Sequence, residues 1–352
     1  MKTIFNKTIL QAFCLLLICI SFAAQASEKI IILTTITDLA DITQSITGDL
    51  AEVSSLCDGR EDPHSLTVRP SFVVKARDAQ VWIRVGMELE VGWEPPILRD
   101  SRNRRIQVGA PGHIDVSEKI IPLDVPQGEV TRDQGDVHAY GNPHYWLDPL
   151  NGRLAARYIA ARLEALYPEH AEEFRSNLAK FLLSLDQRMF GEALVTRMGG
   201  ARLWKLLLQG TFERELEQSG TADLCGGWYA VLRPYAGRPV ATYHRSWIYL
   251  LQRFQLGLAG ELEPKPGIPP SPRHLHKLSK TFKEQAVQII LQEPFYSSKA
   301  AELLAGRLPG CKILVCPNST GGGEGADSYF DMLDHVINRL AMAFQDIDSN
   351  HE

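Results

Sequence analysis

The sequence has no excess of positive charge and, beyond its N-terminus, no long hydrophobic run. Its 352 residues carry 37 Lys and Arg against 42 Asp and Glu, a formal net charge of −5. Nucleic-acid-binding proteins normally carry a basic face, so this balance argues against that class. The mean hydropathy of −0.12 excludes a protein with many membrane spans. With 45% hydrophobic and 22% charged residues, the composition is typical of globular proteins, and the length fits two domains.

The one long apolar run that the sequence has lies at its N-terminus. Lys2 and Lys7 precede it, the apolar run itself covers Ile9–Ala24, and Ala24–Ala26 has the small-residue pattern of a cleavage site. The run is shorter than the roughly 20 apolar residues that a membrane span needs. These features predict a secretory signal peptide over residues 1–26 that is removed on export. We therefore expect a soluble exported protein, located in the periplasm.

Cysteine is scarce, and the cysteines form no recognisable metal or redox motif. Of the six, Cys14 and Cys19 fall in the predicted signal peptide. The other four are spaced unlike a zinc ribbon or a CxxC redox pair; they are Cys57, Cys225, Cys311 and Cys316. An oxidising compartment would allow one disulfide among them, and the spacing does not assign its pairing.

Strand-like and helix-like stretches alternate along the first half. Mostly apolar strands separated by helices indicate a parallel sheet covered on both faces. The segment Gly109–Asn142 is rich in Gly, Pro and acids, and we expect a long surface loop there, followed by a helix that ends near Leu166. The predicted strands are Lys29–Thr35, Ala51–Cys57, Gln80–Val85 and Arg105–Val108, with helices over Asp38–Thr47, Ser71–Ala76 and part of Leu89–Arg99.

A long helix and a second alternating half follow. Pro is tolerated at a helix start, and between Pro168 and Met198 only Gly191 interrupts the helical pattern. About 30 residues at about 1.5 Å each would span about 45 Å, enough to join two domains as a strut. The second half has predicted strands over Pro239–Tyr243, Leu258–Glu263, Val287–Gln292 and Lys312–Cys316, with helices over Ser246–Gln255, Pro272–Glu284, Ser298–Arg307 and Asp327–Phe344.

These elements predict an α/β protein of two lobes, each built on a parallel sheet of about four strands. The predicted boundaries are an N-terminal lobe over residues 27–166, a bridging helix over 167–198 and a C-terminal lobe over 199–352. Ligands of open α/β sheets bind beyond the carboxyl ends of the strands. A site in the cleft between two such lobes is therefore geometrically natural.

Three of the ten histidines stand in loops where such a site would form. His64 follows a strand of the first half, His144 ends the long loop, and His244 ends the strand PVATY. A lone histidine is more often a hydrogen-bonded core or surface residue than a metal ligand. Three of them suit Zn²⁺ with a fourth oxygen or sulfur donor, because neutral imidazole is a preferred ligand of this ion.

Five segments around these residues resemble one bacterial family. They read DPHSLTVRPS, GNPHYWLDP, VATYHRSWIYLLQRF, EPKPGIPPS and QEPFYS, and their order and spacing agree with the family as well. The family is that of the metal-binding receptors of bacterial ABC importers for zinc and manganese. The resemblance implies two α/β lobes joined by one long helix, with one metal ion in the cleft between them and no catalysed reaction.

The resemblance also implies which residues bind the metal. His64 and His144 match the ligands of the first lobe, and His244 matches the first ligand of the second lobe. Zinc-binding members have His at this third position, where manganese-binding members tend to have Glu. The residue at position 244 therefore favours zinc, in agreement with the coordination chemistry.

The fourth donor stays open. The family often has an Asp after its last strand, whereas Val315–Ser319 contains no carboxylate. A water molecule, His138 from the long loop or the Cys316 thiolate would each complete the site. Glu293, in QEPFYS, is expected near the cleft, where it would orient a histidine or a loop by hydrogen bonding.

These features predict a periplasmic receptor that binds Zn²⁺ and delivers it to an ABC permease in the inner membrane. We expect a monomer that is not an enzyme and binds no nucleic acid. A manganese or iron receptor of the same family is the first alternative. The second is a zinc hydrolase with Glu293 or Glu61 as base, although the sequence has no HExxH signature. In a third, zinc is incidental to a structural or adhesive protein.

Overall fold

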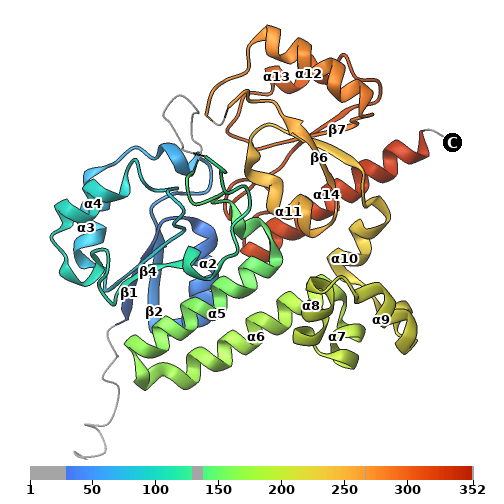
Figure 1. Ribbon diagram of the computed structural model, residues 1–352. Helices are drawn as coiled ribbons and strands as arrows, with labels where there is room; N and C mark the ends of the chain where they lie inside the picture. The colour runs from blue at the N-terminus through green and yellow to red at the C-terminus, as the bar shows by residue number, and fades with distance from the viewer. Residues whose placement is uncertain (1–28, 129–137, 266, 351–352) are drawn as a thin grey trace, which may run out of the picture.

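Two α/β lobes stand side by side, and long helices run beneath both of them (Figure 1). The computed structural model describes residues 29–128, 138–265 and 267–350, so the predicted signal peptide lies outside the described residues. The N-terminal lobe appears in blue and cyan, and the C-terminal lobe in yellow and orange. Within the described ranges, no helix combines the length and the apolar character that crossing a membrane requires.

Each lobe is built on a four-stranded parallel sheet, as predicted. The strand order is β2-β1-β3-β4 in the N-terminal lobe and β6-β5-β7-β8 in the C-terminal lobe, so the two orders correspond. Strand β7 is buried at every position, which is the expected environment of an apolar strand with both faces covered. The strands are β1 Ile30–Thr34, β2 Ala51–Ser55, β3 Val81–Arg84, β4 His113–Asp115, β5 Pro239–Thr242, β6 Gly257–Glu261, β7 Ile289–Gln292 and β8 Lys312–Val315.

The helices lie around and between the two sheets. The N-terminal lobe carries α2 Thr37–Thr47, α3 Pro70–Asp78, α4 Glu94–Ser101 and α5 Pro149–Leu166. The C-terminal lobe carries α11 Ile248–Arg253, α12 Pro272–Glu284, α13 Lys299–Ala305 and the closing α14 Tyr329–Ser349. Between them lie α6 Ala171–Phe190, α7 Glu192–Met198, α8 Gly200–Leu208, α9 Phe212–Ser219 and α10 Gly227–Leu232.

The bridging helix is α6, and it is shorter than predicted. It packs against α2 and α5 of the N-terminal lobe at one end and against α10 at the other. Its 20 residues span about 30 Å at about 1.5 Å per residue. The helix ends at Gly191, whose φ of 86° is left-handed, and a Cβ there would lie 2.9 Å from the backbone of Gly226. The predicted continuation to Met198 is therefore wrong, because α7 is a separate helix.

One predicted strand is also wrong. Residues Arg104–Ile106 form a 3₁₀ turn, and of the predicted strand Arg105–Val108 only Ile106 is buried. Val108 is 74% exposed, so this segment offers too little apolar surface to join the sheet. The fourth strand is instead β4, which lies inside the segment predicted as a long loop and pairs with β3 through Trp82 and His113.

All four cysteines among the described residues are free thiols, so the disulfide that the sequence would allow is not formed. Cys57 follows β2 of the N-terminal lobe, whereas Cys316 follows β8 of the C-terminal lobe. Cys311 and Cys316 stand at opposite ends of β8. At about 3.3 Å per residue they are about 16 Å apart along the strand, beyond the reach of a disulfide.

A single large core links the two lobes. It contains Ile32 of β1, Phe181 of α6, Ile289 of β7 and Leu340 of α14, so both sheets and the bridging helices share it. A smaller core around Phe282 lies beneath the α12 and α13 side of the C-terminal lobe. The shared core therefore packs residues of both sheets against the same set of helices.

Candidate metal centre

The three predicted ligand histidines come together where the two lobes meet. Each offers one ligand nitrogen, and the nitrogens of His64, His144 and His244 lie within 4.8 Å of one another. The ring centroids are 5.0 to 5.4 Å apart. His144 and His244 are buried, with only 2% and 4% of their surface exposed. Across residues 29–128, 138–265 and 267–350, no other set of three such side chains meets this criterion.

The N-terminal lobe presents its two histidines in matching turns. In Asp62-Pro63-His64, the Asp62 Oδ1 accepts the backbone N–H of His64 at 3.0 Å and lies 2.7 Å from its Nδ1. In Asn142-Pro143-His144, the Asn142 Oδ1 accepts the backbone N–H of His144 at 3.0 Å and lies 3.0 Å from its Nδ1. An Asx side chain that bonds two residues ahead, with Pro between, forms a rigid turn from local sequence alone.

The C-terminal lobe presents its histidine differently. His244 follows β5, and its Nδ1 lies 2.7 Å from the Oε2 of Glu263, which follows the neighbouring strand β6. Both side chains are at most 5% exposed. The orienting carboxylate is therefore 19 residues away in sequence, and it reaches His244 only because β5 and β6 pair in the sheet.

The acceptors determine which nitrogen of each ring can bind a metal. A carboxylate or amide oxygen only accepts, so each Nδ1 must carry the proton. In the neutral ring each Nε2 then keeps its lone pair, which is the form a metal requires. Burial, reinforced by the neighbouring imidazoles, lowers the pKa of His144 well below its ordinary value. Burial raises the pKa of Asp62, but its hydrogen bonds with His64 outweigh this and lower it to about 2.

His138 from the long loop contacts the histidine cluster through His64. Its Nε2 is 3.1 Å from the Nε2 of His64, and the two ring centroids are 5.2 Å apart. Burial and the neighbouring histidines lower the pKa of His138 to about 3, so its ring is neutral at neutral pH. The Oε2 of Glu88 accepts the N–H of Ala139 at 2.7 Å, which fixes the backbone next to this ring.

A cavity of about 420 Å³ opens onto the histidines. Its lining includes His138, His144 and His244. It also includes Arg245 and Asp124, whose side chains are 41% and 25% exposed. The Arg245 guanidinium contacts both carboxylate oxygens of Asp124, which belongs to the long loop of the N-terminal lobe. The cavity therefore connects the buried histidines with solvent through a polar mouth formed by both lobes.

The other two predicted contributors lie outside the histidine cluster. Glu293 is fully buried and accepts a hydrogen bond from Ser246, two residues after His244, while its Oε2 has no partner among the described residues. Burial raises the pKa of Glu293 to about 8. Cys316 is buried as well, and burial raises the pKa of its thiol to about 12, which disfavours the thiolate that a metal needs.

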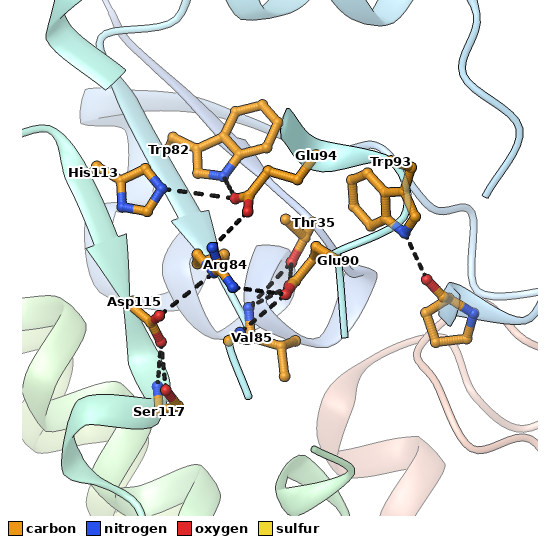
Figure 2. A network of polar contacts seen from close by, with 12 residues as sticks. Thr35, Trp82, Arg84, Val85, Glu90, Trp93, Glu94, His113, Asp115 and Ser117 are labelled. Atoms are coloured by element: carbon orange, nitrogen blue, oxygen red, sulfur yellow. Dashed lines mark hydrogen bonds and ion pairs between the residues drawn. The ribbon is translucent and has the colours of Figure 1, made fainter. Parts of the chain in front are cut away.

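A buried polar network of the N-terminal lobe (Figure 2) contacts the turn that carries His64. Trp93 donates its indole N–H to the carbonyl of Pro63 at 2.8 Å. The loop that carries Trp93 is held by Glu90, which accepts the N–H of Val85 at 2.7 Å and contacts Arg84. Burial raises the pKa of Glu90 to about 7. The network ties the carboxyl end of β3 to the residue that precedes the ligand.

The segment that carries His144 is fixed at its other end as well. Asp148 caps α5 by accepting the N–H of Leu150 and also forms a two-point ion pair with Arg253 of α11, at 2.7 Å for each contact. Trp146 donates to the carbonyl of Asn318 at 2.7 Å, in the loop after β8. The Asp148–Arg253 ion pair and the Trp146–Asn318 hydrogen bond both cross from the N-terminal to the C-terminal lobe.

Three functional residues were missed at the sequence level, namely Asp62, Asn142 and Glu263. Two of them had a visible signal, because an Asx-Pro-His tripeptide occurs twice and each time ends in a predicted ligand. Glu263 opens the segment EPKPGIPPS. Its contact with His244 depends on strand pairing, so no local pattern could have indicated it.

The chain resembles proteins of known function over most of its length. The family model described as "Zinc-uptake complex component A periplasmic" matches residues 32–189 and 228–343. The stretch between the two matches contains α7, α8 and α9. The high-affinity zinc uptake system protein ZnuA of Yersinia pestis is 23% identical over 319 residues, which cover 88% of this chain and 89% of that protein.

Other relatives are named for other metals or match a shorter region. The manganese ABC transporter substrate-binding lipoprotein PsaA of Streptococcus mitis is 28% identical, over 47% of this chain and 50% of its own length. A crystal structure of ZnuA shares the fold with a TM-score of 0.65 at 22% identity, covering 90% of this chain and 99% of that one. The Mn-bound periplasmic metal-binding protein of Candidatus Liberibacter asiaticus gives a TM-score of 0.63 at 19% identity.

The family model covers well over half of the chain, and its two matched stretches contain His64, His144 and His244. The two-lobed fold and the histidine cluster between the lobes agree with that match. The chain therefore belongs to the family of periplasmic metal-binding receptors of ABC importers that the zinc-uptake component A proteins represent.

Proposed function

We propose that this protein is a periplasmic receptor that binds one Zn²⁺ through His64, His144 and His244 and delivers it to an ABC permease in the inner membrane. The observation that carries the proposal is the orientation of the three rings. Each Nδ1 is engaged by an oxygen acceptor, so the three Nε2 atoms are left to bind one ion. Metal-binding histidines generally have this arrangement.

The donor set favours zinc over manganese. Family members are named for either metal, as ZnuA of Yersinia pestis and PsaA of Streptococcus mitis illustrate. Imidazole nitrogens suit zinc, whereas manganese prefers carboxylate, carbonyl and water oxygens. Among the described residues, the clustered donors at this site are imidazoles, and the nearby carboxylates of Asp62 and Glu263 are directed at the Nδ1 atoms.

His138 is the fourth donor in this proposal. Four ligands at about 2.0–2.1 Å in a tetrahedron are about 3.4 Å from one another. The Nε2 atoms of His138 and His64 are already 3.1 Å apart. The separations of up to 4.8 Å among the other three nitrogens require only small inward movements of the rings. A fourth imidazole would close the site to water, as in zinc sites that do not catalyse reactions.

The predicted base Glu293 of the hydrolase alternative is not placed to act on a metal-bound water. Glu293 is fully buried, already accepts a hydrogen bond from Ser246, and is absent from the lining of the cavity that reaches the histidines. A general base must come within hydrogen-bond reach of a water bound at the metal. The environment of Glu293 instead suits a residue that holds the loop after His244.

Competitive titration of the metal-free protein with Zn²⁺ and Mn²⁺, against a coloured chelator, tests the proposal. We expect one Zn²⁺ per chain, bound more tightly than Mn²⁺. His244→Ala should weaken zinc binding about a hundredfold to a thousandfold, because a four-ligand site is worth about 10–16 kcal/mol and each tenfold is about 1.4 kcal/mol. The exposed His276 of α12 provides the matched control. Unchanged affinity in His244→Ala, or tighter binding of Mn²⁺, would overturn the assignment.

A further inference from the structure

The two Asx-Pro-His turns share one geometry but differ in one atom. In both, Oδ1 of the Asx residue accepts the backbone N–H and the ring Nδ1–H of the histidine two residues later. The first turn uses the carboxylate of Asp62, and the second uses the amide of Asn142. Orienting a histidine needs only the shared oxygen, so this task does not explain the difference.

The difference is explained by the second atom of each Asx side chain, which crosses to the C-terminal lobe. The Nδ2 of Asn142 donates to the carbonyl of Arg245 at 2.9 Å, and Arg245 directly follows the ligand His244. The Oδ2 of Asp62 faces the hydroxyl of Tyr296, which donates to it across 3.5 Å. A carbonyl can only accept and therefore requires an N–H donor, whereas the Tyr296 hydroxyl can donate or accept and so tolerates a carboxylate.

The orientation of the Asn142 amide follows from its partners. The backbone N–H of His144 can only donate, so it requires the amide oxygen, and the backbone carbonyl of Arg245 requires the amide nitrogen. Asn142 is 8% exposed, so water does not readily replace either bond. Reversing the amide, or replacing it by a carboxylate, leaves two oxygens facing each other.

We infer that Asp62 and Asn142 are positioning residues that couple the two lobes to the metal ligands, and that the Arg245 carbonyl of the C-terminal lobe dictates the amide at position 142. The inference rests on the proposed zinc site. Through one side chain, Asn142 fixes the His144 ring and the backbone beside His244. A change at either end therefore reaches ligands of both lobes, whereas loss of a lobe contact elsewhere does not.

Charge balance is a competing explanation for the use of Asp at one position and Asn at the other, and an experiment can distinguish the two explanations. Two carboxylates, Asp62 and Glu263, already orient histidines, and together they would balance the charge of one divalent ion. If only this balance mattered, an exchange of Asp62→Asn with Asn142→Asp in one protein would be harmless, because it conserves the net charge and both Oδ1 acceptors. On the coupling inference the exchange fails, because the new carboxylate at position 142 faces the Arg245 carbonyl.

The experiment compares the zinc dissociation rates of four variants, measured with a chelator in excess. Asn142→Ala loses both bonds, and we expect dissociation about a hundredfold faster, the upper end of the effect of outer hydrogen-bonding partners. Asn142→Asp keeps the ring acceptor and should be about tenfold faster. The double exchange should be at least as fast as Asn142→Asp. Tyr249→Phe is the control, because it removes two lobe-crossing backbone bonds, to the carbonyl of Asn142 at 2.8 Å and from the N–H of Leu123 at 3.0 Å, but none to a histidine ring; we expect less than a twofold change.

A second measurement reports on the His144 ring itself. Nitrogen NMR of the metal-free protein distinguishes a ring protonated on Nδ1 from one protonated on Nε2. The wild type, Asn142→Asp and Tyr249→Phe should keep the Nδ1–H form, and Asn142→Ala should show a mixture. Thermal melting confirms that each variant is folded before zinc is added. If the buried carboxylate of Asn142→Asp prevents folding, the comparison of Asn142→Ala with Tyr249→Phe still tests the inference.

Three results would overturn the inference. The first is a double exchange that restores the wild-type dissociation rate, which would favour the charge count. The second is an Asn142→Ala variant that releases zinc no faster than Tyr249→Phe, and the third is an unchanged ring tautomer in Asn142→Ala. A wild-type protein that takes up no zinc would instead contradict the proposed function, so the two failures are distinguishable.

Discussion

The two lobes supply the same chemical group to the site by different means. The N-terminal lobe orients His64 and His144 from two residues away, through Asx-Pro-His turns that local sequence forms. The C-terminal lobe orients His244 with Glu263, which is 19 residues distant and stands at the end of the neighbouring strand. The sheets beneath these ligands have corresponding strand orders, so the difference lies in the loops.

This difference divides the site into a locally determined half and a half that depends on tertiary structure. An Asx-Pro turn restrains its histidine whether or not the opposite lobe is in place. The orientation of His244 requires β5 and β6 to be paired, and their ladder contains an irregularity between Val240 and Ala241. We therefore expect His244 to be more sensitive to loss of its orienting residue than His64 is.

Removing the orienting carboxylates tests this difference with the largest expected effect. Glu263→Ala should weaken zinc binding about a hundredfold, and Asp62→Ala about tenfold, because Pro63 still restrains the His64 turn. Competitive zinc titration of the two variants, with melting curves of the metal-free proteins, measures both. Equal losses, or a larger loss in Asp62→Ala, would show that the local turn gives no advantage.

A buried aspartate, Asp38, lies where the two lobes meet, and its burial disfavours the ionised form. Asp38 of α2 is fully buried and accepts both the N–H and the hydroxyl of Thr320 in the loop after β8. Burial raises its pKa from 3.8 to about 7, although the bonds from Thr320 act in the opposite direction. Between pH 4 and 7 the folded state therefore holds a proton that the unfolded state has released.

The consequence is a pH-dependent loss of stability. Because the folded-state pKa is raised, the contribution of Asp38 is most favourable near pH 4 and is lost as the pH rises to about 7. Relative to wild type, Asp38→Asn should gain stability over this range, by a few kcal/mol at most. Urea unfolding of the metal-free proteins at pH 4.5 and 7.5 measures the gain. A constant difference between the two proteins would contradict the raised pKa.

Removing the loop histidine is expected to have an intermediate effect on zinc binding. His138→Ala should weaken binding about tenfold, or about 1.4 kcal/mol, because water can replace the fourth imidazole while the three other rings remain oriented. The change should appear mainly as faster dissociation, and Tyr140→Ala, which changes a 68% exposed residue of the same loop, is the control. A loss as large as that in His244→Ala would make His138 an equal member of the ligand set.

The smallest effect is expected at the buried cysteine. Cys316→Ala should change zinc affinity less than threefold, which is below about 0.7 kcal/mol, because burial keeps the thiol protonated and outside the histidine cluster. Titration of the variant beside wild type measures this directly. A tenfold loss would restore the thiolate as a candidate fourth ligand.

Sequence patterns predict the two-lobed architecture because most of its elements have strong local signals. The apolar strand over residues 289–292 and the helix Pro272–Glu284 were predicted closely, because a buried run and a Ser-capped, Pro-started helix are strong local signals. The segment Arg105–Val108 misled because its alternating apolar residues resemble a strand, yet Val108 faces solvent. Strand β4 was missed because it is only three residues long.

The site was predictable only in part. The ligands followed from the resemblance and from the positions of three histidines near strand ends, and the structure brings these three together. The orienting contact between Glu263 and His244, and the bond from Asn142 to the Arg245 carbonyl, join residues 19 and 103 positions apart. Such contacts depend on the packing of strands and lobes, which no local pattern in a single sequence encodes.

Anomalous X-ray diffraction from crystals of the zinc-loaded protein, recorded on both sides of the zinc absorption edge, is the most direct test of the metal centre. We expect one strong peak per chain, bonded to the Nε2 atoms of His64, His144 and His244, with each Nδ1 still paired to its oxygen acceptor. A peak elsewhere in the molecule, or a zinc ion at this site bonded through Nδ1 atoms or carboxylates instead, would contradict the assignment.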